Sequence, residues 1–358
     1  MSYTVPSFRH PNLPRNELGY TSKDYEGAVS TLCAGCGHDS ISAAIIDACF
    51  QMSIQPHRVA KLSGIGCSSK TPTYFLGNSH GFNSVHGRMP SVATGANMAN
   101  RNLLYIGVSG DGDTASIGMG QFVHAVRRNI NMVYICENNG VYGLTKGQDS
   151  ATTDLGSKSK KGDPSPYEPI DLCALSLQLG ATFVANSFSG DKDQLVPIIQ
   201  AAIAHKGFAF INVISPCVTF NNVSSSTKAY DYMRQHMAST NTVDYVPTAD
   251  EITTDYQEGT TERVTMHDGS YLNLHKLEAQ HDIHSRRSAL KLMKDYGAED
   301  KVLTGVLFID ETTQELHEIM KTTKTPLRNL TEKELCPGAD ALEKPVSYTH
   351  LRAHETVR

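Results

Sequence analysis

Two short stretches of this 358-residue sequence combine residue types that bind a phosphorylated ligand through a metal ion. The first is Gly110-Asp111-Gly112-Asp113, which follows an almost unbroken apolar run over 103–108. The carboxylate of Asp111 is a ligand that Mg²⁺ prefers, and Mg²⁺ usually bridges to phosphate oxygens. Gly110 and Gly112 let the backbone approach a bulky anion. The helix expected next offers its N-terminal N–H groups to the same anion.

The second stretch follows the apolar run 132–136, where Asn139 supplies an amide oxygen and Val141 a backbone carbonyl. Gly-Asp-Gly and Asn139-Gly140 are each also typical of a plain β-turn. The combination is more specific, because ligands of open α/β sheets bind at the carboxyl ends of the strands. Paired in this way, the two stretches resemble the thiamine diphosphate motif. We therefore predict one metal–diphosphate site between residues 110 and 141.

A second group of candidates is found among the eight cysteines. Four of them lie in or beside expected loops that contain glycine or proline: Cys33, Cys36, Cys67 and Cys217. Four thiolates are suited to a tetrahedral zinc ion or to a [4Fe–4S] cluster, and the Cys33–Cys36 pair is also compatible with a redox dithiol. Residue types alone leave these three alternatives open. The remaining cysteines are expected in the core (Cys49, Cys136 and Cys173) or in a polar tail (Cys336).

The elements that must position these residues alternate along the chain. Apolar runs predict strands, and amphipathic stretches between them predict helices, one of them over 40–52 with Ser40 as its cap. The expected strands span 59–63, 103–108, 132–136, 182–185 and 208–214. The other expected helices span 89–100, 117–128, 170–179 and 194–205. This alternation predicts an α/β fold with a doubly wound, mostly parallel sheet covered by helices on both faces.

The pattern changes along the chain and predicts four segments. Residues 1–29 form an N-terminal arm, 30–225 the ligand-binding core, and 226–344 an irregular α+β C-terminal extension. In the extension we expect a hairpin over 264–274 around Asp268-Gly269, a helix over 285–296 and a strand over 302–309. The tail 345–358 continues no pattern and resembles a translated sequencing-adapter read-through, so it is excluded from the predicted fold.

Composition narrows the classes of function. Apolar residues make up 39% and charged residues 19% of the chain, as in ordinary globular proteins. The net charge of −5 argues against a nucleic-acid partner. The sequence has no apolar run of about 18 residues to span a membrane, and its start lacks the apolar region of a signal peptide. We therefore expect a cytoplasmic protein, in which clustered cysteines bind metal more often than they form disulfides.

Taken in order along the chain, the motifs resemble those of the β subunit of the 2-oxoacid:ferredoxin oxidoreductases. The resemblance covers roughly residues 30–225, and the C-terminal part is similar to the 2-oxoglutarate branch. The motifs are Cys33-Ala34-Gly35-Cys36-Gly37-His38, Gly64-Ile65-Gly66-Cys67-Ser68, His86-Gly87-Arg88, Gly110-Asp111-Gly112-Asp113, Asn139-Gly140-Val141-Tyr142, Gly143-Leu144-Thr145-Lys146-Gly147-Gln148 and Pro216-Cys217.

The resemblance implies three cofactor sites. It implies that Cys33, Cys36, Cys67 and Cys217 bind one [4Fe–4S] cluster. It implies that Asp111, Asn139 and the Val141 carbonyl bind Mg²⁺. The residues expected to bind thiamine diphosphate are His38, Gly66, Ser68, His86, Gly110, Asp111, Gly112, Asp113, Asn139, Val141, Tyr142, Gly143 and Leu144.

Three residues are expected to act on the substrate: His86, Lys70 and Lys146. Lys70, Leu144 and Lys146 match positions that contact the 2-oxoacid side chain in the family. Two lysines are suited to a distal carboxylate, which favours 2-oxoglutarate over pyruvate, because an ammonium group facing a methyl group would remain unpaired. The alternatives are a hydrogen-bonded loop histidine at 86 and ordinary surface lysines.

The implied reaction is oxidative decarboxylation of 2-oxoglutarate with coenzyme A to succinyl-CoA and CO₂, with ferredoxin reduced, or the reverse. No convincing carboxylate for the aminopyrimidine is apparent, since Glu137 is expected at a strand end on the metal side. In the family this glutamate comes from an α subunit, so the chain is expected to be inactive alone. Three alternatives remain: an oxidoreductase for pyruvate or several 2-oxoacids, a non-redox thiamine diphosphate decarboxylase or synthase with structural zinc, and a non-enzymatic metal-binding module.

Overall fold

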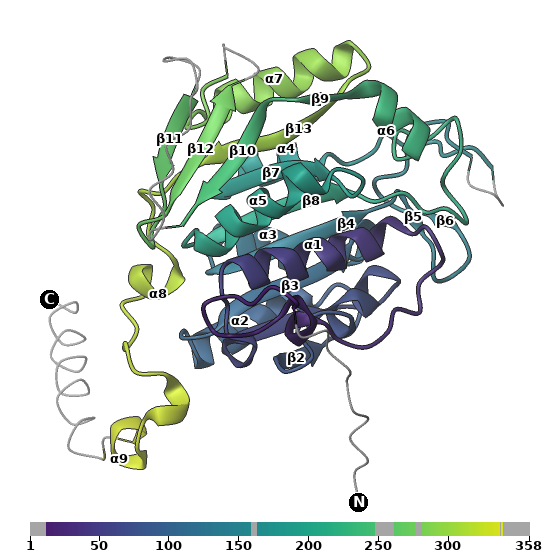
Figure 1. Ribbon diagram of the computed structural model, residues 1–358. Coiled ribbons are helices and arrows are strands. Elements are labelled where there is room, and N and C mark those ends of the chain that lie inside the picture. Colours follow the sequence, from purple (N-terminus) through teal and green to yellow (C-terminus); the bar gives the residue numbers. More distant parts are fainter. Residues whose placement is uncertain (1–11, 159–162, 248–260, 277–280, 337, 339–358) are drawn as a thin grey trace, which may run out of the picture.

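An eight-stranded sheet forms the centre of the molecule (Figure 1). The computed structural model describes residues 12–158, 163–247, 261–276, 281–336 and 338. The strands of the sheet are β1 (Val59–Ser63), β2 (His80–Asn83), β3 (Leu104–Gly110), β4 (Met132–Asn138), β7 (Phe183–Phe188), β8 (Phe208–Ile214), β9 (Met237–Ser239) and β13 (Val302–Ile309). Their order is β2-β1-β3-β4-β8-β7-β13-β9. All neighbours are parallel except β13 and β7, which confirms the predicted mostly parallel sheet.

Helices cover both faces of this sheet (Figure 1). Helices α1 (Gly37–Gln51) and α5 (Lys192–Ala204) share one apolar cluster with Val133 and Ile135 of β4. The opposite face carries α2 (Met89–Ala99), α3 (Met119–Arg127), α4 (Leu172–Leu179) and α7 (Arg286–Ala298), which share a second cluster with Met132, Tyr134 and Cys136. Alternate residues of one buried strand thus face opposite layers, which explains its unbroken apolar sequence.

The predicted strands and helices agree with the structure within a few residues, whereas the cap predicted at Ser40 was wrong. Helix α1 begins at Gly37 with Cys36 at its N-cap, so Ser40 lies within the first turn and caps nothing. Helix α3 begins at Met119 because a π-helical segment, Gly112–Ile117, precedes it. Gly118 follows that segment and packs against Gly87, where a Cβ would stand 2.9 Å from the Gly87 Cα.

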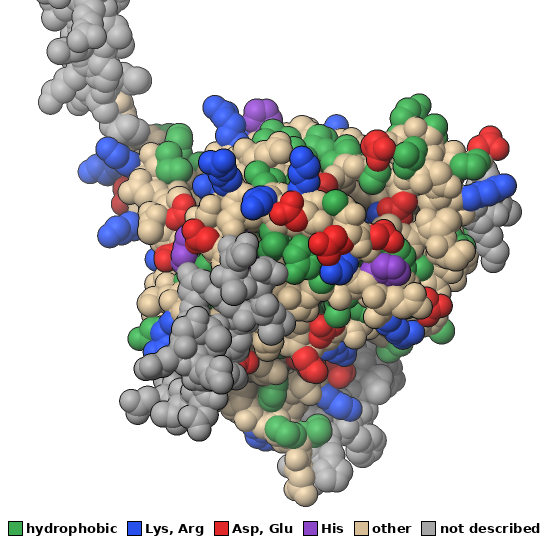
Figure 2. Space-filling model, turned by 90° about the horizontal axis from the view of Figure 1, so that it is seen from above, with side chains coloured by type: hydrophobic (Ala, Val, Ile, Leu, Met, Phe, Trp, Pro, Cys, Tyr) green, Lys and Arg blue, Asp and Glu red, His purple; other side chains and the backbone are tan. Residues whose placement is uncertain are grey.

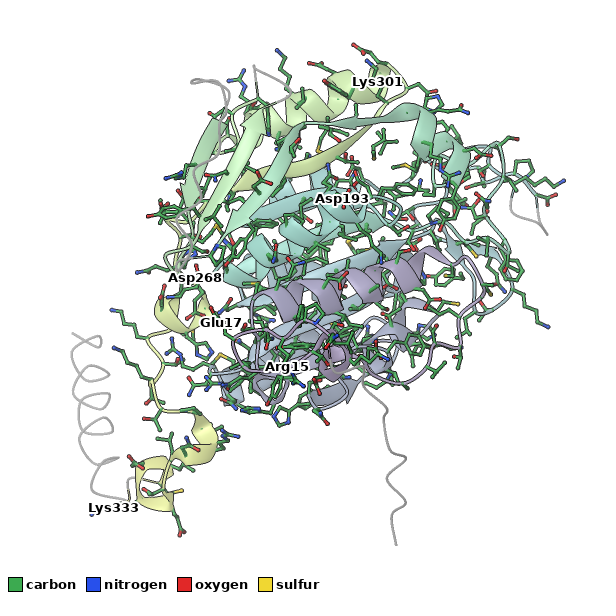
Figure 3. All side chains as sticks on the ribbon, viewed as in Figure 1. Arg15, Glu17, Asp193, Asp268, Lys301 and Lys333 are labelled. Atoms are coloured by element: carbon green, nitrogen blue, oxygen red, sulfur yellow. The ribbon has the colours of Figure 1, made fainter. Side chains whose placement is uncertain are left out.

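Part of the C-terminal extension is built onto the central sheet, which β13 and β9 extend beyond β7. The remainder includes an antiparallel sheet of β10 (Asn241–Val246), β12 (Tyr271–Lys276) and β11 (Thr261–Thr265), with the expected turn at Asp268-Gly269 at one end (Figure 3). Shorter elements are α6 (Tyr230–His236), α8 (Leu316–Ile319), α9 (Glu332–Leu335), β5 (Val141–Tyr142) and β6 (Gln148–Asp149). Residues 1–11 of the expected arm and the tail 345–358 lie outside the described residues.

Two further observations concern the surface and the helices. On the face seen from above, basic and acidic side chains intermingle (Figure 2), which is in keeping with the small net charge of −5. Within the described residues, no helix combines the length and the apolar character needed to cross a bilayer.

One buried histidine of the core predicts a pH dependence of stability. His205 follows α5, its Nε2 lies 2.8 Å from the Thr182 Oγ1, and burial lowers its pKa from 6.5 to about 3. Between these values the unfolded chain binds more protons than the folded chain, so stability decreases as the pH falls below 6.5. We expect the wild type to lose about 2 kcal/mol more than His205→Gln between pH 7 and pH 5. Urea unfolding at both pH values measures this difference.

The exposed His57 provides the matched control. His57→Gln is expected to lose as much stability on acidification as the wild type. Equal losses for the wild type and His205→Gln would show that His205 does not contribute to the acid sensitivity.

Candidate cofactor and metal site

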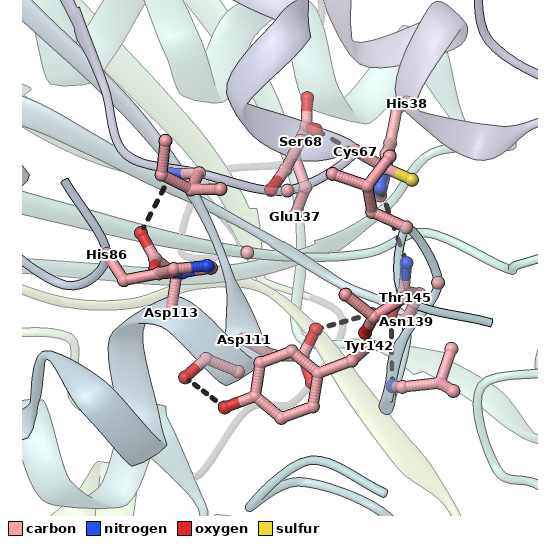
Figure 4. Close-up of a pocket in the computed structure, with 17 residues that line it drawn as sticks. His38, Cys67, Ser68, His86, Asp111, Asp113, Glu137, Asn139, Tyr142 and Thr145 are labelled. Carbon is pink, nitrogen blue, oxygen red and sulfur yellow. Dashed lines mark hydrogen bonds and ion pairs between the residues drawn. The ribbon is translucent and has the colours of Figure 1, made fainter. Parts of the chain in front are cut away.

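A cavity opens where β3 and β4 end side by side, with Gly110 of β3 paired to Glu137 of β4. Its wall contains every residue that the sequence predicted to bind the cofactor (Figure 4). These are His38, Gly66, Ser68, His86, Gly110, Asp111, Gly112, Asp113, Asn139, Val141, Tyr142, Gly143 and Leu144. Four further residues complete the wall: Ile65, Cys67, Glu137 and Thr145.

Asp111 lies at the floor of the cavity and is almost fully buried. Its carboxylate accepts hydrogen bonds from the Ser150 hydroxyl, from Thr152 Oγ1 at 2.7 Å and from the Asn139 N–H at 3.3 Å. Burial nevertheless raises the pKa of Asp111, and the hydrogen bonds oppose this only in part. A divalent cation would remove that penalty by compensating the charge. Ser150 and Thr152 were not predicted, because nothing in their sequence distinguishes them from other loop hydroxyls.

Asn139 and the residues after it form the opposite wall. The Asn139 side-chain oxygen accepts a hydrogen bond from the Val141 N–H at 3.1 Å, and its backbone carbonyl accepts one from Asn221 at 2.8 Å. Tyr142 donates its hydroxyl to the Gly112 carbonyl at 2.9 Å, and a Cβ at Gly112 would stand 2.4 Å from the tyrosine ring. The glycine therefore permits the two loops to pack together. Asp111, Asn139 and Val141 line this one cavity, and their carboxylate, amide and carbonyl oxygens are the types of ligand that Mg²⁺ prefers.

Asp113 connects three loops around the cavity. Its Oδ1 accepts hydrogen bonds from His86 Nδ1 at 2.7 Å and from the Gly87 N–H at 2.9 Å, and its Oδ2 accepts one from the Ile65 N–H at 3.4 Å. A Cβ at Gly64 would stand 1.9 Å from that same carboxylate oxygen. The structure thus gives Asp113 a role in holding loops, in addition to its place in the cavity wall.

The cysteines proposed to act together lie together in the structure. A Cβ on Gly143 would stand 3.6 Å from the Cys217 sulfur and 3.7 Å from the Cys67 sulfur. Cys33 accepts a hydrogen bond from Thr219, two residues after Cys217, and its carbonyl accepts one from the Cys36 N–H. Cys67 also lines the cofactor cavity. Cys67 and Cys217 therefore lie on either side of Gly143, at the edge of the cavity.

Without a bound metal, burial keeps two of these thiols protonated. Burial raises the pKa of Cys36 to about 12 and also raises that of Cys67, and neighbouring thiols add to both shifts. Thiolate ligation by iron or zinc would reverse these shifts, because a coordinating thiol is deprotonated. Within the described parts of the chain, no group of three or more His, Cys, Asp or Glu side chains stands in an arrangement for a single metal ion. As expected, Cys49, Cys136 and Cys173 are buried, while Cys336 is exposed.

Of the three residues expected to act on the substrate, the structure places one in the cavity wall. His86 lines the cavity and is 45% exposed, whereas Lys70 and Lys146 are not among the lining residues. Lys146 is exposed and has a left-handed backbone (φ 82°), directly after the lining residues Leu144 and Thr145. Lys146 is thus the residue after the lining segment in sequence and does not itself belong to the wall.

Glu137 lines the cavity, although the sequence did not predict a role for it. It is fully buried, and neither carboxylate oxygen has a hydrogen bond within normal geometric limits. Burial raises its pKa well above the usual range. The Thr71 hydroxyl opposes this shift, but it donates to the Ser68 carbonyl at 2.7 Å. His38 Nδ1 lies 3.4 Å from Glu137 Oε2, and burial lowers the pKa of His38 to about 4.

The sequence of the chain is similar to those of several known proteins. Residues 64–213 match the thiamine pyrophosphate enzyme family, C-terminal TPP binding domain. The chain is 43% identical over 199 residues to the 2-oxoacid:ferredoxin oxidoreductase subunit beta of Saccharolobus solfataricus, a match covering 55% of this chain and 65% of the relative. It is 41% identical over 192 residues to the 2-oxoglutarate synthase subunit KorB of Methanocaldococcus jannaschii, covering 52% of this chain and 69% of that relative.

The fold has a counterpart among solved structures. This is the 2-oxoglutarate:ferredoxin oxidoreductase from Magnetococcus marinus with 2-oxoglutarate, coenzyme A and succinyl-CoA bound. It matches with a TM-score of 0.67 and 28% identity, covering 92% of this chain and 97% of that chain. The sequence match spans slightly less than two thirds of the Saccharolobus relative, at 65% of its length.

Proposed function

This chain belongs to the β subunits of the 2-oxoacid:ferredoxin oxidoreductases, and from that premise we propose that it forms half of a 2-oxoglutarate:ferredoxin oxidoreductase. The complete enzyme would convert 2-oxoglutarate and coenzyme A to succinyl-CoA and CO₂ while reducing ferredoxin, or catalyse the reverse. One observation carries the proposal: the predicted cofactor residues line a single cavity, and Cys67 belongs both to its wall and to the thiol group beside it.

The residues of this chain would hold two cofactors. Asp111, Asn139 and the Val141 carbonyl would bind Mg²⁺ and, through it, the diphosphate. Cys33, Cys36, Cys67 and Cys217 would carry a [4Fe–4S] cluster beside the cavity, suited to transferring single electrons. When bound, thiamine diphosphate supplies the carbon nucleophile and the electron sink that decarboxylation requires.

The protein around these groups would position and shield them. Asp113 holds His86 and Gly87 by hydrogen bonds, which would keep the histidine in one orientation when a substrate is bound. Tyr142 closes the wall against Gly112. A glutamate from an α subunit would complete the site, and Glu137 is not proposed for that role.

Reconstitution tests the proposal. The chain and an α subunit would be co-expressed, purified anaerobically and assayed for ferredoxin reduction with 2-oxoglutarate, pyruvate and other 2-oxoacids. We expect a brown complex that is active with 2-oxoglutarate, whereas the β subunit alone is inactive. Activity of the isolated β subunit would contradict the shared active site. A colourless protein that contains zinc and thiamine diphosphate would instead indicate a non-redox thiamine enzyme.

Substitution of Lys146 tests which 2-oxoacid the complete enzyme prefers. We propose that the Lys146 ammonium binds the distal carboxylate of 2-oxoglutarate, because Lys146 follows the lining residues Leu144 and Thr145. Lys146→Ala is expected to raise the KM for 2-oxoglutarate about 10-fold or more, as the loss of one charged hydrogen bond implies, with little effect on the KM for pyruvate. Steady-state assays of the complex measure both.

Lys294→Ala is the matched control, because Lys294 is an exposed lysine on α7. It is expected to leave both KM values unchanged. If Lys146→Ala raised the two KM values equally, Lys146 would not discriminate between these substrates.

A further inference from the structure

Glu137 remains without a function in the scheme above, although its burial is costly. A buried acceptor without a hydrogen-bond partner costs about 1–3 kcal/mol, and more when it is charged. The residue lies at the carboxyl end of β4, two positions before the proposed metal ligand Asn139. His38 lies beside it, 3.4 Å away between Nδ1 and Oε2, and both side chains are buried in the cavity wall.

His38 connects Glu137 to Asn139 (Figure 4). Its Nε2 lies 3.4 Å from the side-chain nitrogen of Asn139, and its Nδ1 lies 2.6 Å from the Ser215 hydroxyl. An amide nitrogen can only donate, so Nε2 must be the acceptor, and Nδ1 carries the proton of the neutral ring. That N–H bonds to the Ser215 hydroxyl, and Glu137 Oε2 lies 3.4 Å from the same nitrogen without forming a hydrogen bond.

The orientation of the Asn139 amide follows from these contacts. His38 accepts from its nitrogen, while its oxygen accepts from the Val141 N–H at 3.1 Å. A flipped amide would place a donor against the Val141 N–H, which also donates. It would also present nitrogen to the metal, and an amide N–H₂ group is not a ligand for Mg²⁺. The correct orientation of this one side chain therefore matters for the metal site.

We propose that Glu137 and His38 form an orienting relay that holds the Asn139 side chain with its amide oxygen available to the divalent metal. The Glu137 carboxyl group lies 3.4 Å from His38 Nδ1 and favours a proton on that nitrogen. This tautomer leaves Nε2 as an acceptor, and Nε2 holds the Asn139 nitrogen. Glu137 is a positioning residue in this arrangement. The inference rests on the proposed metal–diphosphate site and adds a role for two side chains outside the metal's own ligands.

Metal affinity of the purified αβ complex tests the relay. Mn²⁺ binding would be titrated by electron paramagnetic resonance at saturating thiamine diphosphate, for the wild type and for Glu137→Gln. Residues that orient a metal ligand typically change affinity 10- to 100-fold, so we expect Glu137→Gln to weaken Mn²⁺ binding by about that factor. Glu315→Gln, which alters another buried glutamate, paired with Arg101, is the control and is expected to bind Mn²⁺ normally.

A double-variant cycle separates orientation from general damage. In the Asn139→Asp background a carboxylate presents an oxygen in either orientation, so the relay has nothing left to orient. Glu137→Gln is therefore expected to change Mn²⁺ affinity less than about 2-fold in this background. An equal loss in both backgrounds would overturn the relay, as would a lower melting temperature with unchanged Mn²⁺ affinity. If the wild-type complex bound neither Mn²⁺ nor thiamine diphosphate, the proposed function itself would fail.

Discussion

Asp111→Asn is expected to weaken the binding of thiamine diphosphate with Mg²⁺ about 100- to 1,000-fold. The substitution keeps the shape of the side chain but removes the negative charge from a buried site where a divalent cation is expected. Truncating one partner of a buried charge pair costs about 2–5 kcal/mol, and each 1.4 kcal/mol is a factor of ten in affinity. Isothermal titration of the αβ complex with the cofactor and Mg²⁺ measures the change.

Stability provides a second measurement of the same substitution. Burial raises the pKa of Asp111, which means that the ionised carboxylate is disfavoured in the cofactor-free protein. Asp111→Asn is therefore expected to leave the melting temperature of the cofactor-free complex unchanged or higher, although it weakens binding. Asp295→Asn, at an exposed position of α7, is the matched control for charge removal. Unchanged cofactor affinity in Asp111→Asn would exclude Asp111 as a metal ligand.

Cys67→Ser is expected to remove iron from the protein and to abolish electron transfer to ferredoxin. The proposed cluster requires four thiolates, and Cys67 is the one that also lines the cofactor cavity. We expect the iron content per β subunit to fall from about four toward zero, with loss of the visible absorbance, and ferredoxin reduction to fall at least about 1,000-fold. Anaerobic iron analysis and absorbance spectra measure the first effect, and stopped assays the second.

The core cysteine Cys49 provides the control for this experiment. It is fully buried in α1, and burial raises its pKa to about 12, so it is expected to act as a small apolar side chain. Cys49→Ala is expected to retain iron and to lose about 1 kcal/mol of stability. If Cys67→Ser retained full iron content, or if the wild type contained zinc in place of iron, the cluster assignment would be wrong.

The sequence patterns and the family resemblance together predicted 13 of the 17 residues in the cavity wall. Buried parallel strands are continuous apolar runs, so 103–108 and 132–136 could be recognised and their carboxyl ends located. Ligands bind at such ends, so Asp111 and Asn139 were predicted to approach one another although a helix and a strand separate them. β3 and β4 are neighbours in the sheet, as that prediction required.

The tertiary structure decided what surrounds those residues. Ser150 and Thr152 bond to Asp111, and Ser215 bonds to His38, from loops whose sequences show no periodic signal. The C-terminal strand β13 joined the central sheet antiparallel to β7, a pairing between segments more than a hundred residues apart that no local pattern specifies.

Glu137 shows most clearly the difference between what the local sequence determines and what tertiary packing decides. Its sequence neighbours place it at a strand end, where a glutamate is ordinarily solvated. Only the packing of α1 over β4 buries it against His38 and removes its hydrogen-bond partners. Local sequence thus determined which residues could bind a metal and a diphosphate, because strand ends and turn glycines are encoded within a few positions. Tertiary packing decided which polar groups lost water and acquired new neighbours, because burial depends on segments that are distant in sequence.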